Sequence, residues 1–335
     1  MDAKALRENL RAEALALGFD VFGVAPIEAD VKADYFKKWI ADGMHGEMEW
    51  MAKDTERRTE VTRVLPEAQS IIVVGLNYYQ PQPNPNYQIA KYALGQDYHN
   101  IITKKLRKLC TVMRTLGGAQ KPYVDTGPVL EKPLAVAAGL GWQGKSTIIL
   151  QPEFGTWLFL GIIITTLKLE SSSPAINRCG SCTRCITACP TSAIIAPYKL
   201  DARKCLAYLT IEHKGPIPVE YRKPLGNRIF GCDDCLDVCP WNKWAKETKE
   251  NKFKARPQPI LKETLSWSEA DFLNQFRGTP VKRLGLLRWW RNALTVMGNT
   301  GTPGDLEAIG RLVNHADPMV SEHACWARDQ ILSRN

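Results

Sequence analysis

The chain has 335 residues, of which 44% are hydrophobic and 24% are charged, as is ordinary for a globular protein of two or three domains. The most apolar run, 157–169, is too short to cross a bilayer, and the first residues follow an amphipathic helix pattern unlike a signal peptide. We therefore expect a cytoplasmic protein. The formal net charge of +9 makes nucleic acid a candidate partner, although surplus lysine can also serve solubility alone.

Helical and strand-like patterns alternate over the first 169 residues. Continuous apolar runs predict strands at 21–25, 70–77 and 157–165. Apolar residues at helical spacing predict helices at 1–20, 33–53, 101–116 and 129–138. This half of the chain should therefore contain a sheet with helices packed on it.

Polar residues between these elements are candidates for a site. Arg57 and Arg58 could bind a phosphate or carboxylate, or could form a solvated turn. Tyr98 and His99 precede a predicted helix, where a lone histidine is usually structural. Asp125 follows a strand end and precedes Thr-Gly, a position where aspartate commonly only hydrogen-bonds the turn. Residue type alone leaves each alternative open.

The segment 139–146 satisfies the spelling of both a P-loop and a dinucleotide-binding loop. Both motifs require a strand before the loop and a helix after it, because the phosphate binds at the helix N-terminus. Here a predicted helix comes first and strands follow. We therefore expect no ATP or dinucleotide at this loop, although its glycines would allow close approach to some bulky ligand.

Four cysteines at 179–190 follow the pattern C-x2-C-x2-C-x3-C-P. Bacterial ferredoxins use this spacing to bind a [4Fe–4S] cluster, with the fourth cysteine reaching toward a second cluster. Such dense cysteines make a poor disulfide framework, and zinc sites rarely use three short steps in a row. The spacing predicts one iron–sulfur cluster here and another elsewhere in the chain.

A second motif at 232–240 has the pattern C-x2-C-x3-C-P and lacks the first cysteine of the ferredoxin pattern. The corresponding residue is Ile229, which cannot bind iron, so the isolated Cys205 is the expected replacement. Exchange of the last cysteine between motifs predicts two ligand sets. The first set is Cys179, Cys182, Cys185 and Cys239, and the second is Cys189, Cys205, Cys232 and Cys235. We expect the remaining Cys110 and Cys325 to be buried, inert thiols.

The C-terminal third begins with a basic stretch and ends in helices. Residues 241–256 contain six basic and three aromatic residues, a mixture that suits RNA or, alternatively, a solvated face over packed tryptophans. Helices are predicted at 287–297, closed by Gly298-Asn299, at 304–313, and from Pro318 to Ile331 with Asp317 as its cap. These helices resemble a HEAT-type repeat that packs on the preceding domain.

Several segments together resemble the epoxyqueuosine reductase (QueG) family over nearly the whole chain. They are 125–135 (DTGPVLEKPLA), 138–146 (AGLGWQGKS), 155–161 (GTWLFLG), both cysteine motifs with Cys205, and the closing helices. The resemblance implies an α+β fold in four parts. These are a nitroreductase-like cobalamin-binding domain at 1–169, a ferredoxin-like two-cluster module at 170–240, a basic connecting segment at 241–264 and a HEAT-like helical region at 265–335.

The resemblance also implies an oxidoreductase that reduces epoxyqueuosine to queuosine at the wobble position of tRNA, the last step of queuosine biosynthesis. Its cofactors would be cobalamin and two [4Fe–4S] clusters, supplied with electrons by an external low-potential donor. Asp125 matches the family's proposed proton donor, a role that suits a carboxyl group with a raised pKa. We expect a monomer without membrane contact. Motif position suggests cobalamin contacts from Arg57, Tyr98, His99, Asp125, Lys145, Ser146, Ile149 and Leu160.

Two other functions fit parts of the pattern. A cobalamin reductase of another substrate, such as a dehalogenase, would share the corrinoid and the clusters, but the basic C-terminal half and the absent twin-arginine signal argue against it. A ferredoxin-type electron carrier would not need the 170 or so residues that precede the clusters. Corrinoid binding would separate the carrier from both enzymes, and activity on modified tRNA would separate the two enzymes.

Overall fold

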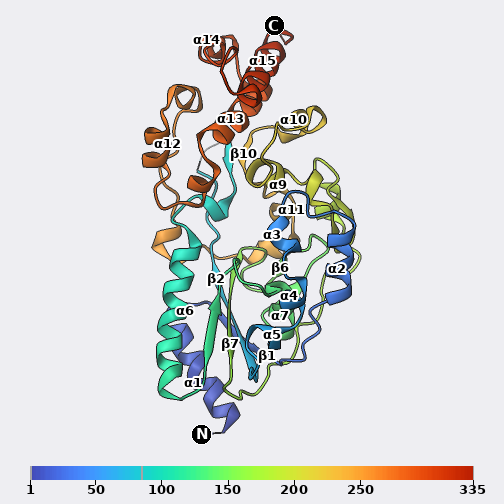
Figure 1. Cartoon of the computed structure of the whole chain (residues 1–335), viewed down its shortest axis with the longest axis vertical. Helices are drawn as coiled ribbons and strands as arrows, with labels where there is room; N and C mark the ends of the chain where they lie inside the picture. The colour runs from blue at the N-terminus through green and yellow to red at the C-terminus, as the bar shows by residue number, and fades with distance from the viewer. Residues whose placement is uncertain (1, 84–85, 335) are drawn as a thin grey trace.

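The computed structural model describes residues 2–83 and 86–334, and a four-stranded antiparallel sheet forms the middle of its N-terminal half (Figure 1). The strands lie in the order β1 (Val21–Ala25), β2 (Ser70–Asn77), β7 (Leu158–Thr165) and β4 (Gln120–Tyr123). Every residue of β2 is buried, as its continuous apolar run predicts. The mixture of this sheet with many helices confirms the α+β class.

Helices cover both faces of the sheet, because successive residues of a strand point to opposite sides. Ile72 and Val74 of β2 face α1 (Ala3–Ala16) and α6 (Tyr98–Thr115), while Ile71 and Val73 face α5 (Val61–Val64) and α7 (Glu131–Ala137). Figure 1 shows these helices on either side of the strands. Short helices join the first two strands: α2 (Ala33–Ala41), α3 (Glu49–Ala52) and α4 (Thr55–Thr59).

Helix α6 begins three residues before its predicted start. Asp97 caps the helix, since its carboxylate accepts a hydrogen bond from the His99 N–H at 3.1 Å. Tyr98 and His99 consequently lie in the first turn of a helix instead of a preceding loop. This shift fixes the direction of both side chains.

The Gly-rich loop follows α7 and leads into a hairpin of β5 (Trp142–Gln143) and β6 (Ile149–Leu150). The predicted order of helix, loop and strands is confirmed. The loop therefore has no following helix whose N-terminus could bind a phosphate. Among the described helices, none is both long and apolar enough to cross a bilayer.

The cysteine-rich region consists of short elements that return to the N-terminal half. Strand β10 (Arg228–Phe230) pairs in parallel with β3 (Gln88–Ile89), and 91–93 form a short turn, η1 (Lys91–Ala93). The helices α8 and α11 pack against each other. The elements are α8 (Arg184–Thr187), β8 (Ile194–Ala196), β9 (Lys199–Leu200), η2 (Ala202–Lys204), α9 (Leu206–Ile211), α10 (Val219–Leu225) and α11 (Asp234–Asp237).

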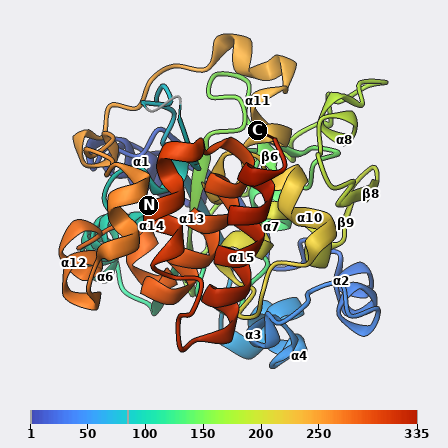
Figure 2. The ribbon, with the colours of Figure 1, turned by 90° about the horizontal axis from the view of Figure 1, so that it is seen from above.

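The C-terminal third is helical, as predicted, but two predicted helix ends are wrong: the helix predicted at 304–313 ends at Gly310, and the helix predicted at 287–297 is longer. Helix α13 (Leu286–Thr300) continues through Gly298 and Asn299. A Cβ on Gly298 would collide with the Trp326 ring of α15 (Pro318–Leu332), so the glycine permits close helix packing and does not end the helix. Figure 2 shows these two helices side by side. Smaller elements are η3 (Pro240–Trp244), η4 (Asn251–Phe253), η5 (Leu261–Ser266), α12 (Glu269–Gln275), η6 (Pro280–Leu284), η7 (Pro303–Asp305) and α14 (Leu306–Gly310).

The predicted cap of the last helix is confirmed, because the Asp317 carboxylate accepts hydrogen bonds from two N–H groups of its first turn at 3.0 and 3.2 Å. The core of these helices is continuous with side chains from 87–94 and 202–230. The basic stretch also packs inward, with Phe253 buried against Phe159 of the sheet. The C-terminal helices and the cysteine-rich region therefore share one core.

Candidate active site

Asp125 lies in the turn after β4 and is held there from several elements. Its backbone has φ +57°, in the left-handed region that residues with a side chain rarely adopt. The carboxyl of Glu131, at the start of α7, accepts a hydrogen bond from the Asp125 N–H at 2.7 Å. The Arg58 guanidinium donates to the carbonyls of Gly127, in the same turn, and of Trp50, at 3.2 and 2.8 Å. These contacts fix an otherwise unfavourable conformation.

The Asp125 carboxylate meets two consecutive residues of α6. The Tyr98 hydroxyl donates to Asp125 Oδ2 at 2.6 Å, and His99 Nε2 lies 3.4 Å from the same oxygen. His99 Nδ1 lies 2.8 Å from Asp97 Oδ1. The Tyr98 ring stacks on Phe159 of β7, with ring centroids 4.3 Å apart. A chain of aspartate, histidine and aspartate, with a tyrosine beside it, therefore stands at the N-terminus of α6.

These contacts set the protonation states of the site. Burial alone would raise the pKa of Asp125, but hydrogen bonds from His99 and Tyr98 outweigh it and hold that pKa below its ordinary value. Burial lowers the pKa of His99, yet its bonds to Asp125 and Asp97 raise the pKa to about 9. The expectation of a raised pKa at Asp125 is therefore wrong. At neutral pH the proton resides on His99 and the carboxylate is ionised.

Sequence reasoning missed two residues of this site, Glu131 and Asp97, and it named Arg58 only as a ligand of a phosphate or carboxylate or as a turn residue, whereas Arg58 binds backbone carbonyls. Burial, and then the negative charge of Asp125, raises the pKa of Glu131 to about 8. Asp97 could have been found as a helix cap, since aspartate is favoured at that position. Arg58 and Glu131 act on backbone groups of a distant or irregular turn, and such contacts leave no periodic signal in a sequence.

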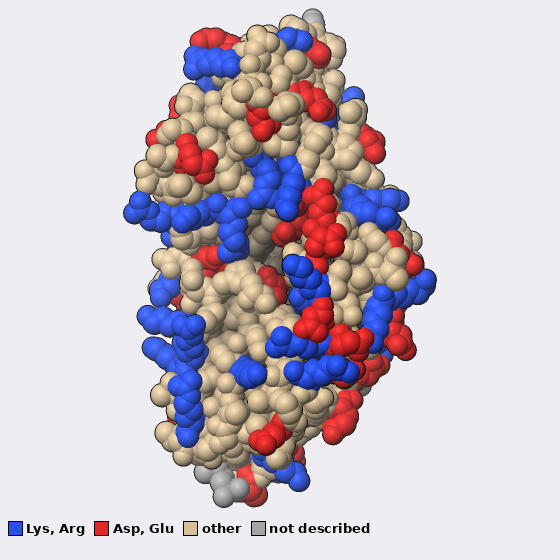
Figure 3. Space-filling model, viewed as in Figure 1, with Lys and Arg blue, Asp and Glu red and all other residues tan. Residues whose placement is uncertain are grey.

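The Asp125 side chain and that of Lys132 line a hollow. The Asp125 side chain is 56% exposed, and Lys132 is also exposed. Even so, burial is the largest influence on the pKa of each, raising that of Asp125 and lowering that of Lys132. Side chains that are enclosed by protein and still reachable by solvent border a concave surface. Figure 3 shows a hollow at mid-height of this face of the molecule, with both basic and acidic side chains on its borders.

The predicted contact residues of the Gly-rich loop lie in and around the β5–β6 hairpin. Ser146 and Ile149 are buried in the β5–β6 hairpin. Lys145 points to the cysteine motif, where its ammonium donates to the carbonyls of Gly180 and Cys182 at 2.7 and 3.0 Å. Lys145 therefore ties this loop to the first cysteine motif.

The other two predicted contacts lie near the sheet. Leu160 of β7 is half-buried and packs against the α7 face. Arg57 is exposed and forms an ion pair with Asp54 at 3.6 Å. Arg57 lies on the side of the Asp125 turn, because its charge reaches Tyr123, the last residue of β4. Burial raises the pKa of Tyr123, and the positive charge of Arg57 opposes this rise. Its buried neighbour Arg58 contacts the turn directly.

The structure gathers the cysteines of the two motifs into two groups, and none of them forms a disulfide. The members of group 1 are identified by their influence on Cys239. Burial, and then the charges of its neighbours, raise the pKa of this thiol to about 11. The neighbours are Cys179, Cys185 and Cys182. The members of group 2 are identified in the same way by their influence on Cys235. The pKa of this thiol is raised by burial and then by Cys205, Cys232 and Cys189. The two groups have the same members as the sets predicted from spacing, and their role as cluster ligands stays a prediction.

Neither cysteine group meets the geometry of a single-ion site. Within 2–83 and 86–334, no three His, Cys, Asp or Glu side chains converge closely enough to hold one metal ion. A [4Fe–4S] cluster takes one cysteine per iron, so its sulfur ligands stand farther apart than those of a single ion. Of the other cysteines, Cys110 is buried as expected, whereas Cys325 is half-buried.

Lys132 connects the two parts of the site. Its ammonium interacts electrostatically first with Asp125 and then with Cys235 and Cys205. Group 2 is therefore the cysteine group on the Asp125 side. Group 1 lies beyond it, on the side of Lys145 and the Gly-rich loop. This order is what a path for electrons toward Asp125 requires.

The cysteine pattern for two clusters matches the model of a known protein family. Residues 178–242 match the model of the 4Fe-4S double cluster binding domain. An iron–sulfur module beside an enclosed group of acid, histidine and tyrosine side chains defines an iron–sulfur oxidoreductase. Residues 58–126, which run from Arg58 to the Asp125 turn, match the model described as epoxyqueuosine reductase QueG, DUF1730.

The relatives agree over nearly the full length. The epoxyqueuosine reductase of Xanthomonas campestris pv. campestris is 41% identical over 98% of this chain and 96% of its own. A crystal structure of epoxyqueuosine reductase with an epoxyqueuosine-modified tRNA-Tyr stem loop has a TM-score of 0.92 at 29% identity, covering 98% of this chain and 90% of that one. The Bacillus subtilis enzyme, with its catalytic aspartate loop swung out, has a TM-score of 0.89 at the same identity and coverage. The chain belongs to the epoxyqueuosine reductase family.

Proposed function

We propose that this oxidoreductase reduces epoxyqueuosine to queuosine at the wobble position of tRNA. The observation that carries the proposal is the placement of Asp125, Tyr98 and His99 at a hollow that adjoins cysteine group 2. Removal of the epoxide oxygen takes two electrons and two protons and releases water. The chain offers a source of electrons and a source of protons on the same side of the hollow. The cysteines would hold electron-carrying clusters, and the titratable side chains would supply protons.

Asp125 is the residue proposed to hand a proton to the departing oxygen. Because its carboxylate is ionised at neutral pH, the proton has to come from a neighbour. His99 is that neighbour, with a pKa of about 9 and its Nε2 3.4 Å from Asp125 Oδ2. The Tyr98 hydroxyl orients the same oxygen, and Asp97 stabilises the charged imidazole. The four side chains thus act as one proton-delivery group.

The cysteine groups are proposed to hold the two [4Fe–4S] clusters. Their members come from both motifs and from Cys205, which stands at the N-terminus of α9. The proposed ligands are Cys179, Cys182, Cys185 and Cys239 for group 1, and Cys189, Cys205, Cys232 and Cys235 for group 2. The Ala193 N–H donates to Cys189 Sγ at 3.2 Å, and such bonds tune the potential of a cluster.

Cobalamin is the proposed third cofactor, and its proposed site is the hollow beside Asp125. Its wall offers the exposed carboxylate of Asp125 and, beside it, the half-buried imidazole of His99, whose Nε2 lies 3.4 Å from that carboxylate. When bound, cobalamin would supply a cobalt centre that accepts and passes on electrons. The residues proposed to hold it are Arg57, Tyr98, His99, Asp125, Ser146, Ile149 and Leu160. Lys145 is left out, because its ammonium is engaged by the cysteine motif.

The tRNA is proposed to bind over the hollow, and the position of one part of the basic stretch supports this proposal. The part at 252–256 lies beside the start of α6, with the Lys252 carbonyl accepting from the Gln96 N–H at 2.8 Å and the Arg256 N–H donating to the Leu94 carbonyl at 3.0 Å. Arg283 reaches the same region and forms an ion pair with Asp97. These cations can contact anticodon phosphates next to Asp125. Lys243 and Lys246 belong to another surface, beside the tryptophans.

The protein is further proposed to be a monomer in the cytoplasm that takes electrons from an external low-potential donor. The sheet with its helices at 1–169 is proposed to be nitroreductase-like, the module at 170–240 ferredoxin-like, and the helices at 265–335 HEAT-like, with 241–264 as the connection between them. The shared core of the last helices and the cysteine-rich region supports a repeat that packs on its neighbour.

The product assay tests the proposed function. The purified protein, reconstituted under anoxia with iron, sulfide and cobalamin, is incubated with epoxyqueuosine-containing tRNA and a chemical reductant. Mass spectrometry of the digested nucleosides should show queuosine, lighter than the substrate by one oxygen atom. Unchanged epoxyqueuosine in a preparation with full iron and corrinoid content would contradict the proposal.

A further inference from the structure

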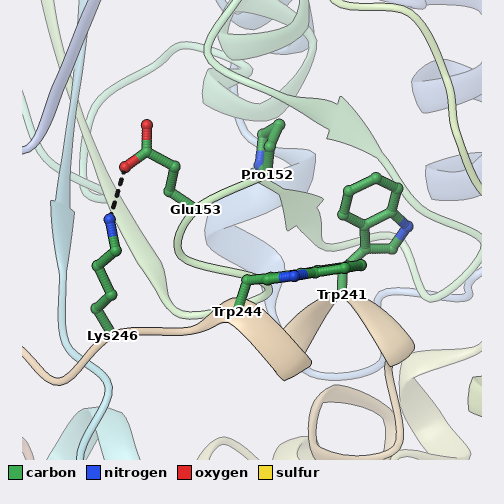
Figure 4. Close-up of a pocket in the computed structure, with 5 residues that line it drawn as sticks. All are labelled: Pro152, Glu153, Trp241, Trp244 and Lys246. Atoms are coloured by element: carbon green, nitrogen blue, oxygen red, sulfur yellow. Dashed lines mark hydrogen bonds and ion pairs between the residues drawn. The ribbon is translucent and has the colours of Figure 1, made fainter.

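The tryptophans beside cysteine group 1 form an exposed groove that the proposed function does not use. Pro152, Glu153, Trp241, Trp244 and Lys246 line a cavity of about 390 Å³. Figure 4 shows the two indole rings forming its floor and one wall, with the Lys246–Glu153 ion pair at its edge. Large exposed aromatic surfaces are uncommon on a protein that has no partner there.

The groove is rigid and belongs to the surroundings of Cys239. Trp241 follows Cys239-Pro240 directly, and its ring meets the buried Trp142 ring with centroids 4.8 Å apart. Trp244 lies 5.4 Å from Trp241 between centroids and is 52% exposed. Asn242, which lies between the two tryptophans in sequence, holds this segment in place, because its side-chain oxygen accepts a hydrogen bond from the Thr156 N–H at 3.0 Å. A rigid aromatic anchor loses little entropy when a partner covers it.

Charge distinguishes this surface from the surroundings of group 2. Exposed cations lie near three of the four group 1 cysteines in sequence: Arg178 precedes Cys179, Arg184 precedes Cys185, and Lys243 follows Cys239 by four residues. The segment 176–189 contains no acidic residue. By contrast, the three aspartates of the second motif are paired with cations of this chain: Asp233 and Asp237 with Lys91, and Asp234 with Arg228. An acidic partner would therefore meet Arg178, Arg184 and Lys243, unpaired among the described residues, at group 1, whereas at the second motif Lys91 and Arg228 are already engaged by aspartates of this chain.

The position of the surface identifies the kind of partner. Lys132 links Asp125 with group 2, so group 1 is the outer of the two groups. A protein that supplies electrons has to approach the outer group, whereas tRNA has to reach Asp125. We propose that the groove of Trp241 and Trp244, with Arg178, Arg184 and Lys243, docks an acidic electron-carrier protein. This inference rests on the proposed function, because the carrier would give up one electron at a time to a cluster held by group 1.

The test measures binding and cluster reduction separately. A flavodoxin, an acidic flavin carrier, serves as the probe under anoxia, and its affinity is measured by calorimetry at several salt concentrations. In the variant Lys243→Glu/Trp244→Ala the affinity should fall roughly tenfold. Bleaching of cluster absorbance by reduced flavodoxin in stopped flow should slow, while bleaching by dithionite should stay as in the unaltered protein. Iron content confirms that the clusters are present, and Lys243→Gln serves if the double variant fails to fold.

The matched control reverses the same charge elsewhere. Lys252→Glu should leave flavodoxin binding unchanged and weaken binding of tRNA. Equal flavodoxin affinity in the unaltered protein and the groove variant, or no binding at all to the unaltered protein, would overturn the proposal. Loss of tRNA affinity in the groove variant would assign the surface to RNA instead. Absence of queuosine with dithionite as reductant would count against the proposed function and not against the docking surface.

Discussion

The two cysteine groups and the Asp125 site were encoded in the sequence in different ways. Seven of the eight grouped cysteines stand in two short motifs, where spacing alone predicts which thiols converge. The Asp125 site is assembled from a strand end, the first turn of α6 and the start of α7. The spacing of residues in the sequence determines the cysteine groups, and tertiary packing determines the Asp125 site. Substitutions in a cysteine group should therefore remove a cofactor. Substitutions at the Asp125 site should change the rate of the reaction while the cofactors remain bound.

Replacing Cys205 should have the largest effect, because it removes the one proposed ligand outside both motifs. Cys205→Ala should lower the iron content from about eight to about four atoms per chain and abolish turnover. Iron analysis after anoxic reconstitution measures this. Cys325→Ala, a half-buried thiol in α15, is the control and should keep full iron. Full iron in the Cys205 variant would remove this residue from the ligand set.

Asp125→Asn should lower turnover of the modified tRNA by about 10²–10⁴-fold, the usual worth of general acid catalysis. Asparagine keeps the shape of the side chain and can still hydrogen-bond the turn, but it cannot carry a proton. Iron content and the corrinoid spectrum should match the unaltered protein. Near-normal turnover with intact cofactors would return Asp125 to the role of an ordinary turn residue.

Charge reversal in the basic stretch should have a smaller effect, confined to binding. Lys252→Glu/Lys254→Glu should weaken tRNA binding and lower the slope of log affinity against log salt by about one for each phosphate that the variant no longer neutralises. Lys243→Glu/Lys246→Glu, in the other part of the stretch, is the matched control with the same change in charge. If both pairs flatten the salt dependence equally, the division of the stretch between two surfaces is wrong.

The smallest expected effect is a shift in the pH profile. His99 is protonated below its pKa of about 9, so activity should persist through neutral pH and fall as the pH rises through that value. Asp97→Asn removes one of the contacts that raise this pKa, and the alkaline limb should therefore move to lower pH. Asparagine can still cap α6, which limits any loss of folding. An unmoved alkaline limb would exclude His99 as the proton source.

Sequence reasoning reached the main elements but not the contacts that make the site. The strands at 21–25 and 70–77, the order around the Gly-rich loop and the cap at Asp317 follow from local patterns and are confirmed. Gly298 misled the prediction, because its small size serves the packing of Trp326. Asp97 changes where α6 starts and holds His99. The raised pKa expected at Asp125 failed for the same reason: the neighbours that set it come from another element.

The most direct test of the account asks whether the two regions work in one reaction. The protein is reduced under anoxia, freed of excess reductant and mixed with epoxyqueuosine-containing tRNA in a stopped-flow instrument. Because the reaction takes two electrons and each cluster stores one, we expect the cluster absorbance to return to its oxidised value as about one queuosine forms per chain. Clusters that stay reduced in the presence of substrate tRNA, with no queuosine formed, would contradict the account.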